Sequence, residues 1–327
     1  MLGIRTALCR LRGARPQPAI LMYHRVTRTE IDPWELAVAP ENFAGHMAYL
    51  KRHRTPLTMS EFVRRHVKGG LPDDAVGVTF DDGYLDNLIN AKPQLDAESV
   101  PATLFVVTGR LAEAQPFWWD ELAALILGHR GGMGDAVRIT DAQVALRWPP
   151  DERLSDEHYW RAWDRPRTPR EAAYIDIWTR LRAVSRLERS QVMASLRERL
   201  GPVDCGDNLP MTAAELMSFR TGGRIELGGH SVSHPALTTL AADECREEID
   251  GSRDDLARLI GTPAAGFAYP YGDMNAAVRA DVARSGFAWA CSTVAGFVGA
   301  SSDLFALPRL AIGDWSVDRL AKSLAAA

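Results

Sequence analysis

Short apolar runs alternate with amphipathic stretches over most of the chain. The apolar runs lie at 19–23, 76–80, 102–107, 224–228, 265–269, 287–292 and 306–312. Between and after them, apolar residues recur at helical spacing over 40–53, 84–97, 241–260, 274–285 and 316–325. Strands that alternate with helices predict βαβ units and a parallel sheet. The sequence therefore predicts an α/β fold, either a barrel or a wound sheet.

One stretch, 110–212, departs from this alternation. We find no convincing pair of strands in it, and apolar residues recur at helical spacing over 118–128, 157–164 and 170–200. We therefore expect one barrel formed by about 19–109 and 213–327, interrupted by a helical insertion at 110–212. Six of the nine tryptophans lie in this insertion. They either pack its interior or provide a surface on which sugar rings stack.

Composition adds several exclusions. The chain has 327 residues, of which 46% are hydrophobic and 24% charged, as in a globular protein. A formal net charge of -4 gives no global attraction to nucleic acid. The cysteines at 9, 205, 245 and 291 form no CxxC pair, which argues against a disulfide framework or a cysteine-zinc site. Arginines interrupt the apolar residues at the N-terminus, so we expect no signal peptide, no membrane-spanning helix and a cytoplasmic location.

Two adjacent carboxylates follow one predicted strand directly, in Thr79-Phe80-Asp81-Asp82-Gly83. The carboxyl ends of parallel strands form the functional site in α/β folds. Two neighbouring carboxylates repel each other there unless a cation compensates their charge. The motif is consistent with a site in which one carboxylate binds a divalent ion and the other transfers protons, or with a simple Asx turn.

Two histidines four residues apart follow another predicted strand, in Gly228-Gly229-His230-Ser231-Val232-Ser233-His234-Pro235. Neutral imidazole is a common zinc ligand, and a tight turn lets both rings reach one ion. With one aspartate they form a two-histidine, one-carboxylate set that leaves positions open for water and substrate. Non-haem iron oxygenases use the same set of ligands. That alternative would predict a jelly-roll fold, and the alternation of strands and helices argues against it.

These two motifs, together with Phe267-Ala268-Tyr269-Pro270-Tyr271-Gly272, resemble the first three motifs of the polysaccharide deacetylases, the NodB-homology or carbohydrate esterase 4 family. The resemblance covers about 19–109 and 213–315. It implies a distorted seven-stranded (β/α) barrel, which agrees with the number of apolar runs. It also implies one divalent metal ion, expected to be zinc, and an acetylated sugar or glycan as the substrate.

The resemblance gives each matching residue a role. Asp82, His230 and His234 would bind the ion, and Asp81 would act as the general base. The backbone N–H of Tyr271 would help to hold the oxyanion that forms on the acetyl group. Pro270 and Tyr271 would also contact the sugar.

The third motif departs from the family pattern at Ala268, where an arginine usually pairs with the general base. Arg309, in Leu307-Pro308-Arg309, could pair with the base from a neighbouring strand end, with a structural salt bridge as the alternative. Asp314 and Trp315 resemble the Asp-Trp of a fourth motif. They would support such an arginine, and Trp315 would contact the substrate.

The last family motif normally supplies a histidine near the C-terminus as general acid, but no histidine follows His234. His24 ends the first predicted strand, and the first and last strands of a closed barrel are neighbours. Family members that resemble the exopolysaccharide deacetylases of biofilms carry a similar Tyr-His segment. We therefore expect His24 to be the general acid, with a packed or capping histidine as the alternative. The other histidines are expected at the surface, at 46, 53, 66, 129 and 158.

The sequence thus predicts a metal-dependent hydrolase that removes an acetyl group from an N-acetylated sugar of a polysaccharide, an oligosaccharide or a biosynthetic precursor. An O-acetyl sugar esterase could use the same site, because the addition step is the same. A catalytically inactive carbohydrate-binding member of the family is a further alternative. The presence of Asp81 and both histidines argues against it.

Overall fold

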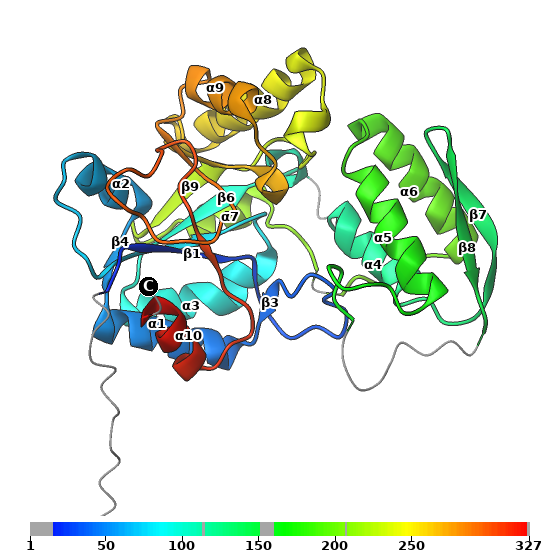
Figure 1. Ribbon diagram of the computed structural model, residues 1–327, viewed down its shortest axis with the longest axis horizontal. Coiled ribbons are helices and arrows are strands. Elements are labelled where there is room, and N and C mark those ends of the chain that lie inside the picture. Colours follow the sequence, from blue (N-terminus) through cyan, green and yellow to red (C-terminus); the bar gives the residue numbers. More distant parts are fainter. Residues whose placement is uncertain (1–15, 113–114, 151–159, 207, 326–327) are drawn as a thin grey trace, which may run out of the picture.

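The barrel is a parallel sheet whose strands match the apolar runs of the sequence. The structure, a computed structural model, describes residues 16–112, 115–150, 160–206 and 208–325 (Figure 1). Seven parallel strands lie in the spatial order β12, β1, β5, β6, β9, β10, β11. They are β1 (Ala19–Tyr23), β5 (Ala75–Phe80), β6 (Ala102–Val106), β9 (Ile225–Gly229), β10 (Gly266–Ala268), β11 (Trp289–Cys291) and β12 (Leu310–Ala311). A further short strand, β4 (Thr55–Leu57), pairs with β5.

A segment near the C-terminus joins the two edges of this sheet. β12 pairs with β1, while Leu307, three residues earlier, forms a bridge with Cys291 of β11. The amide of Leu307 donates to the carbonyl of Ala290 at 3.0 Å, and the amide of Ser292 donates to the carbonyl of Leu307 at 2.8 Å. The first and last strands are therefore neighbours, which confirms the predicted distorted seven-stranded (β/α) barrel.

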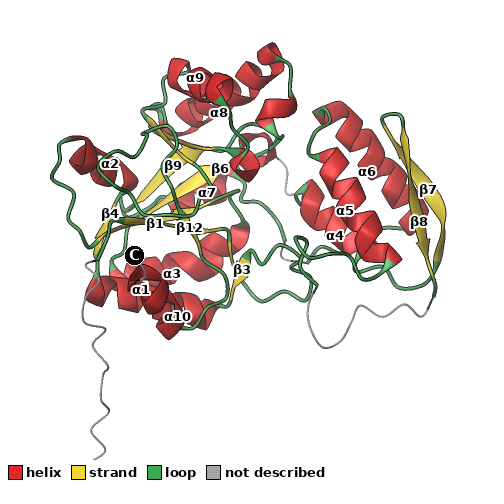
Figure 2. Ribbon diagram, in the orientation of Figure 1, coloured by secondary structure: helices red, strands yellow, loops and turns green. Residues whose placement is uncertain are grey.

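Helices cover both outer sides of the sheet (Figures 1 and 2). On one side lie α1 (Pro40–His53), α3 (Lys92–Glu98) and α10 (Val317–Ala325), and on the other lie α8 (Ala242–Ile260) and α9 (Ala276–Arg284). The helices α2 (Met59–Val67) and α7 (Ala213–Phe219) each begin after a threonine whose hydroxyl accepts a backbone N–H of the first turn. The helix predicted at 84–97 is a π-helical turn (Asn87–Ala91) that continues into α3.

The strands are buried on both of their faces. All six residues of β5 are buried, as expected for parallel strands that are covered by helices. Tyr23 at the end of β1 packs against Phe43 of α1 and Phe80 of β5, with ring centroids 5.2 and 5.6 Å apart. The ends of the strands are consequently the places where polar side chains can gather.

Residues 115–150 and 160–206 form a lobe beside the barrel, on the right in Figure 1. It contains α4 (Trp118–Ile126), β7 (Met133–Ile139), β8 (Ala142–Trp148), α5 (Pro169–Leu181) and α6 (Arg186–Leu200). An apolar cluster fills the lobe and extends to Tyr84 and Val107 on the barrel side. Two backbone hydrogen bonds join the lobe to the rest of the chain. The amide of Ala236 donates to the carbonyl of Arg182 at 2.9 Å, and the amide of Ala162 donates to the carbonyl of Pro33 at 2.7 Å.

The prediction of a purely helical insertion is wrong, because β7 and β8 form an antiparallel hairpin. Buried residues alternate with partly or fully exposed ones along its strands, and the buried ones are Val137, Ile139, Val144, Leu146 and Trp148. This two-residue period is the pattern of a half-buried strand.

Two helices predicted in the lobe also differ from the structure. The stretch 170–200 contains two helices, and the hydroxyl of Ser185 caps the start of the second. Of the helix predicted at 157–164, residues 157–159 lie outside the described part of the chain, and 160–164 form a turn.

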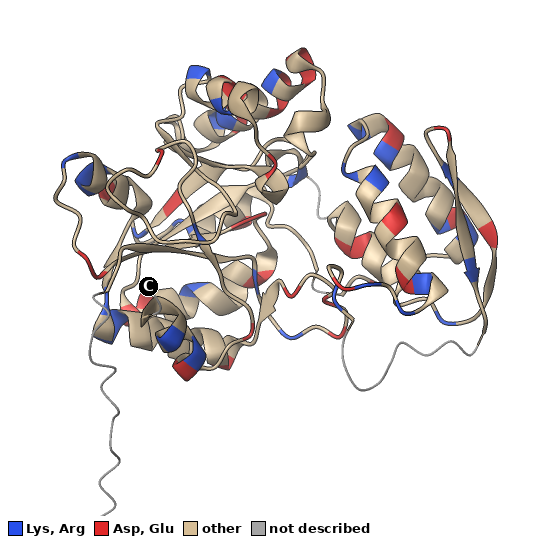
Figure 3. Ribbon diagram, viewed as in Figure 1, with Lys and Arg blue, Asp and Glu red and all other residues tan. Residues whose placement is uncertain are grey.

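The remaining elements are short. The strands β2 (Arg25–Val26) and β3 (Ala37–Val38) pair in parallel, and 3-10 turns occupy Thr108–Arg110, Leu237–Thr239 and Pro270–Gly272. Acidic and basic residues are interleaved along the helices and form no single-sign stripe in the view shown (Figure 3). Among the helices of the described residues, none combines the length and the apolar character that crossing a membrane requires.

Candidate active site

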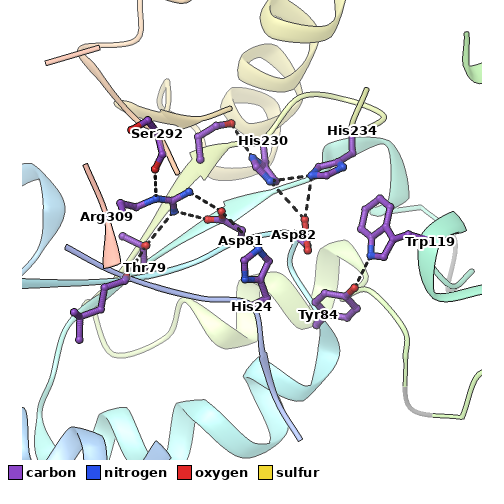
Figure 4. A network of polar contacts seen from close by, with 12 residues as sticks. His24, Thr79, Asp81, Asp82, Tyr84, Trp119, His230, His234, Ser292 and Arg309 are labelled. Carbon is purple, nitrogen blue, oxygen red and sulfur yellow. Dashed lines mark hydrogen bonds and ion pairs between the residues drawn. The ribbon is translucent and has the colours of Figure 1, made fainter. Parts of the chain in front are cut away.

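Residues that are distant in the sequence meet where the barrel strands end (Figure 4). His24 follows β1, the pair Asp81 and Asp82 follows β5, and His230 follows β9 directly. Parallel strands bring their carboxyl ends to one face of the barrel. The structure thus brings together the residues that the first two motifs singled out.

Asp82, His230 and His234 direct three potential ligand atoms toward one point. Oδ1 of Asp82 lies 3.5 Å from Nε2 of each histidine, and the two Nε2 atoms lie 3.2 Å apart. Donors bound at about 2.0–2.1 Å to one tetrahedral ion stand about 3.3 Å from each other. Oδ1 of Asp82 is also buried without a hydrogen-bond partner among the described residues. A divalent cation fits this set and would satisfy that oxygen.

The surroundings of the two histidines favour ligation through Nε2. Nδ1 of His230 lies 2.7 Å from the carbonyl oxygen of Ala268, which can only accept, so Nδ1 carries the proton and Nε2 presents its lone pair. Burial opposes the charged form of His230, but the carboxylates of Asp82 and Asp81 raise its pKa. Burial and the neighbouring His230 hold the pKa of His234 well below its usual value, so that this ring stays neutral.

Asp81 is held by a buried arginine. Nη1 and Nη2 of Arg309 donate to its two carboxylate oxygens, each at 2.7 Å, and Nε of the same arginine donates to the carbonyl of Ser292 at 2.9 Å. Burial alone would raise the pKa of Asp81, but Arg309 together with the charges of His230 and His24 lowers that pKa to about 2. Asp81 is therefore ionised at neutral pH and fixed in orientation.

His24 and Tyr271 border the same site. Nε2 of His24 lies 4.0 Å from Oδ2 of Asp81, and its side chain is 19% exposed. The ring of Tyr271 packs on His234 with centroids 4.4 Å apart, and its hydroxyl donates to the carbonyl of His234 at 3.3 Å. Both residues line one cleft of about 530 Å³ together with Asp81 and Asp82.

Backbone strain is concentrated at this site. Seven non-glycine residues among those described have a positive φ, and four of them are site residues or their neighbours: Asp82 (74°), Ser231 (63°), His234 (58°) and Tyr271 (58°). The left-handed region is unfavourable for such residues and is found preferentially where function demands a particular side-chain direction. At this site a positive φ sets the side-chain direction of Asp82 and His234, two of the three candidate metal ligands.

The lobe supplies one wall of the cleft, and several of its tryptophans border the site. Trp119 of α4 stacks on His234 with centroids 4.6 Å apart (Figure 4), and its Nε1 donates to the hydroxyl of Tyr84 at 2.7 Å. Trp178 of α5 packs on Tyr271, while Trp34 packs on Trp178 at a centroid distance of 4.2 Å. Trp163 also lines the cleft and is 55% exposed. The six tryptophans therefore divide between packing the lobe and bordering the site.

The expected support of Arg309 by Asp314 is wrong, whereas the expected contact of Trp315 with the substrate stays a prediction. The carboxylate of Asp314 accepts hydrogen bonds from the amide of Ala39 and the side chain of Asn42, at the start of α1, and does not contact Arg309. The ring of Trp315 lies against Arg319 and is not among the described residues that line the cleft. The short loop before α10 directs the carboxylate of Asp314 toward the start of α1.

The expected contact of Pro270 with the sugar stays a prediction, whereas the expected surface position of His46 is wrong. Pro270 is buried in its 3-10 turn and, unlike Tyr271, is not among the described residues of the cleft lining. His46 is fully buried rather than at the surface, between the hydroxyl of Tyr23 and the carbonyl of Trp315. Position 158 lies outside the described residues.

Two segments of the sequence, separated by most of the lobe, match a known family. The profile described as polysaccharide deacetylase matches residues 68–128 and 205–290. These two segments of the chain are therefore similar to the polysaccharide deacetylase family. The matched residues include Asp81, Asp82, His230, His234 and Tyr271, whereas His24 and Arg309 lie outside them.

Individual relatives show how far the similarity to this family extends. A poly-beta-1,6-N-acetyl-D-glucosamine N-deacetylase of Staphylococcus aureus is 36% identical over 80 residues, which are 24% of this chain and 27% of that protein. The match thus spans about a quarter of the length of the curated relative.

Two solved structures share the fold. The deacetylase PplD of Streptococcus pyogenes, in complex with acetate, superposes with a TM-score of 0.59 at 18% identity, over 95% of this chain and 99% of that chain. IcaB from Ammonifex degensii gives a TM-score of 0.58 at 17% identity, over 95% and 98% of the two chains. At these identities the likeness supports the fold of the polysaccharide deacetylase family.

Proposed function

We propose that this chain is a metal-dependent deacetylase that hydrolyses the acetamido group of an N-acetylated sugar in a polysaccharide, an oligosaccharide or a biosynthetic precursor. The observation that carries the proposal is the position of Asp81 beside the triad of Asp82, His230 and His234. One carboxylate is free to ligate, and the other is fixed by Arg309 and faces the same cleft. Two adjacent acids with separate partners fit two separate roles.

The ion would be held by Asp82, His230 and His234, and zinc suits this nitrogen and oxygen set. When bound, such an ion acidifies water and polarises the acetyl carbonyl. Asp81 accepts the proton of the attacking water through the carboxylate that Arg309 orients. A carboxyl group with a pKa of about 2 is a weak base, so its action depends on water that is already acidified.

The proton required by the leaving group comes from His24. Water adds to the acetyl carbon, the carbon–nitrogen bond breaks, and the products are acetate and the sugar amine. The amine nitrogen cannot leave as an anion and must take up a proton as the bond breaks. His24 lines the cleft and lies beside Asp81, so it can reach a nitrogen bound there. The backbone N–H of Tyr271 is the proposed donor to the oxyanion.

The cleft suits a sugar because aromatic rings border it. Trp34, Trp163 and Trp178 of its lining present apolar faces on which a pyranose ring can stack. Hydroxyl groups of the sugar remain free to bind water or polar side chains at the open side of the cleft. This arrangement supports the assignment of carbohydrate, rather than a peptide, as the substrate class.

Acetate release is the direct test of the proposal. The purified chain is incubated with N,N′-diacetylchitobiose and with an O-acetylated sugar, before and after treatment with a chelator and after zinc is restored. We expect acetate from the amide, loss of activity with the chelator, and recovery with zinc. Release from the O-acetyl sugar alone would replace the proposal by the esterase alternative. No release from either sugar at full metal content would contradict both.

A further inference from the structure

The catalytic cleft contains one guanidinium group that the proposed reaction does not use. Arg182 follows α5 directly and lines the cleft together with His24, Asp81 and Tyr271. Its guanidinium carbon lies 5.3 Å from the ring centroid of Trp178 and 5.8 Å from that of Tyr271. Within the described part of the chain, no carboxylate forms an ion pair with Arg182. This cation is thus held against the aromatic wall and faces the substrate space.

A second arginine of the lobe adds positive charge close to the same wall. Arg189 of α6 is buried and donates to the carbonyl oxygens of Leu181 at 2.9 Å, Val184 at 3.3 Å and Ser233 at 2.9 Å. These partners are neutral, and Ser233 directly precedes the candidate ligand His234. The carboxylate of Glu248 offsets part of this positive charge, and the remainder acts over a longer distance in a buried environment than it does in water.

The negative charges of the cleft have partners of their own. Asp81 is paired with Arg309 through two hydrogen bonds, and Asp82 faces the proposed cation site. Neither carboxylate is therefore available to neutralise Arg182. A cationic group on a substrate, such as the free amine of an already deacetylated neighbour, would be repelled here. An oxyanion would be attracted and could accept two parallel hydrogen bonds from the planar guanidinium.

We propose that Arg182 selects acetamido sugars that carry an anionic substituent, a carboxylate or a phosphate, within reach of the acetyl group that is removed. This inference rests on the proposed deacetylase function and specifies its substrate class. The packing of Arg182 on Trp178 and Tyr271 limits the conformations of the guanidinium before the substrate arrives. Less conformational freedom is then lost when an anion binds.

A structural role for Arg182 leads to a different expectation. A cation at the end of a helix is stabilised by the helix dipole, and a guanidinium on an aromatic face holds that face in place. If Arg182 served only to support the wall, its replacement would slow every sugar substrate by the same factor. The selectivity between charged and uncharged substrates separates the two roles, whatever happens to the absolute rates.

The test measures kcat/KM for acetate release from four related substrates. They are N,N′-diacetylchitobiose, the disaccharide of N-acetylglucosamine and N-acetylmuramic acid, the methyl ester of that disaccharide, and UDP-N-acetylglucosamine. The methyl ester removes the carboxylate charge and leaves the remaining shape nearly unchanged. The acid and the nucleotide distinguish a carboxylate from a phosphate. Arg182→Gln is compared with Arg180→Gln, which removes an arginine of the same helix that pairs with Asp176 outside the cleft.

We expect the unmodified chain to favour at least one anionic substrate over its uncharged counterpart by about 10-fold or more, and added salt to reduce this preference. Arg182→Gln should abolish the preference, and Arg180→Gln should retain it. Metal content and the thermal midpoint of each variant show whether it is folded. Equal kcat/KM for charged and uncharged sugars in the unmodified chain would overturn the inference, as would a uniform loss in Arg182→Gln. If none of the four releases acetate, the proposed function fails as well.

Discussion

The indole ring of Trp119 stacks on the imidazole ring of His234, with centroids 4.6 Å apart and planes inclined by 46°. Trp119 belongs to the lobe, whereas His234 belongs to the barrel. The indole is held in turn by Tyr84, whose hydroxyl accepts from Nε1 of Trp119 at 2.7 Å and donates to Asp120 at 2.7 Å. The lobe therefore fixes the position of one candidate metal ligand, in addition to bordering the cleft.

We expect Trp119→Ala to weaken metal binding, because His234 would lose the ring that limits its movement. Loss of an interaction that orients a ligand typically costs about 10- to 100-fold in metal affinity. Trp119→Phe keeps an aromatic face but loses the donor to Tyr84, so its effect should be smaller. Competition with a chromogenic chelator measures the affinity. Trp148→Ala, which removes a buried tryptophan of the same lobe away from the cleft, is the control. Equal affinities in Trp119→Ala and the unmodified chain would contradict the role of the stack.

His24→Ala should slow the hydrolysis of an amide more than that of an activated ester. The sugar amine needs a proton in order to leave, whereas p-nitrophenolate leaves without one. We expect a loss of about 10²- to 10⁴-fold in kcat for N,N′-diacetylchitobiose and a much smaller loss for p-nitrophenyl acetate. The two rates are measured on the same preparation at equal metal content. If both fall by the same factor, His24 is not the general acid.

The buried carboxyl of Asp120 should make stability depend on pH. Burial, together with the charges of Asp82 and Asp32, raises the pKa of Asp120 to about 7, although Arg25 and the hydroxyl of Tyr84 act in the opposite direction. In the unfolded chain its pKa is about 3.9. The folded state therefore binds this proton more tightly, and the resulting stabilisation is complete below about pH 4 and is lost as the pH rises through about 7.

Asp120→Asn removes this titration and tests that account. Relative to the variant, the unmodified chain should be less stable at about pH 8 than at about pH 5. Urea unfolding of chelator-treated protein at both pH values provides the comparison. A stability difference between the two proteins that is independent of pH would show that Asp120 does not titrate in this range.

Removing only one partner of the buried ion pair between Arg309 and Asp81 should lower the stability of the fold. Arg309 is fully buried, and Asp81 would remain as an unpaired buried charge without it. We expect Arg309→Gln to destabilise the fold by about 3–5 kcal/mol. The double variant Asp81→Asn with Arg309→Gln should lose less than the single variant, because no charge is then left unpaired. Urea unfolding of the three variants completes the cycle. Additive losses would mean that the two residues do not depend on each other.

The sequence predicted the barrel, and it predicted that the residues of the chemical motifs lie close together. Both predictions depend on local pattern. Each chemical motif follows an apolar run directly, and the carboxyl ends of parallel strands necessarily share one face. That geometry was enough to bring Asp81 and Asp82 together with His230. It also placed Arg309 correctly, since that residue lies next to the segment that closes the barrel.

The contribution of the lobe could not be predicted in this way. Trp119 lies in an apolar helix, where an aromatic residue usually packs in the interior, and only the tertiary fold brings it onto His234. The hairpin, in contrast, had a readable signal in the alternation of its buried residues. Asp314 was misplaced because a two-residue motif in a loop does not specify the direction in which its side chains point.

The two adjacent carboxylates provide the most direct test of the account, because it gives them different tasks. Asp81→Asn and Asp82→Asn are prepared in parallel, and metal content and acetate release are measured on each with an N-acetylated oligosaccharide. We predict that Asp81→Asn retains one metal ion per chain but loses acetate release by about 10²-fold or more, whereas Asp82→Asn loses the metal. Acetate release close to that of the unmodified chain in Asp81→Asn, at full metal content, would contradict the central claim.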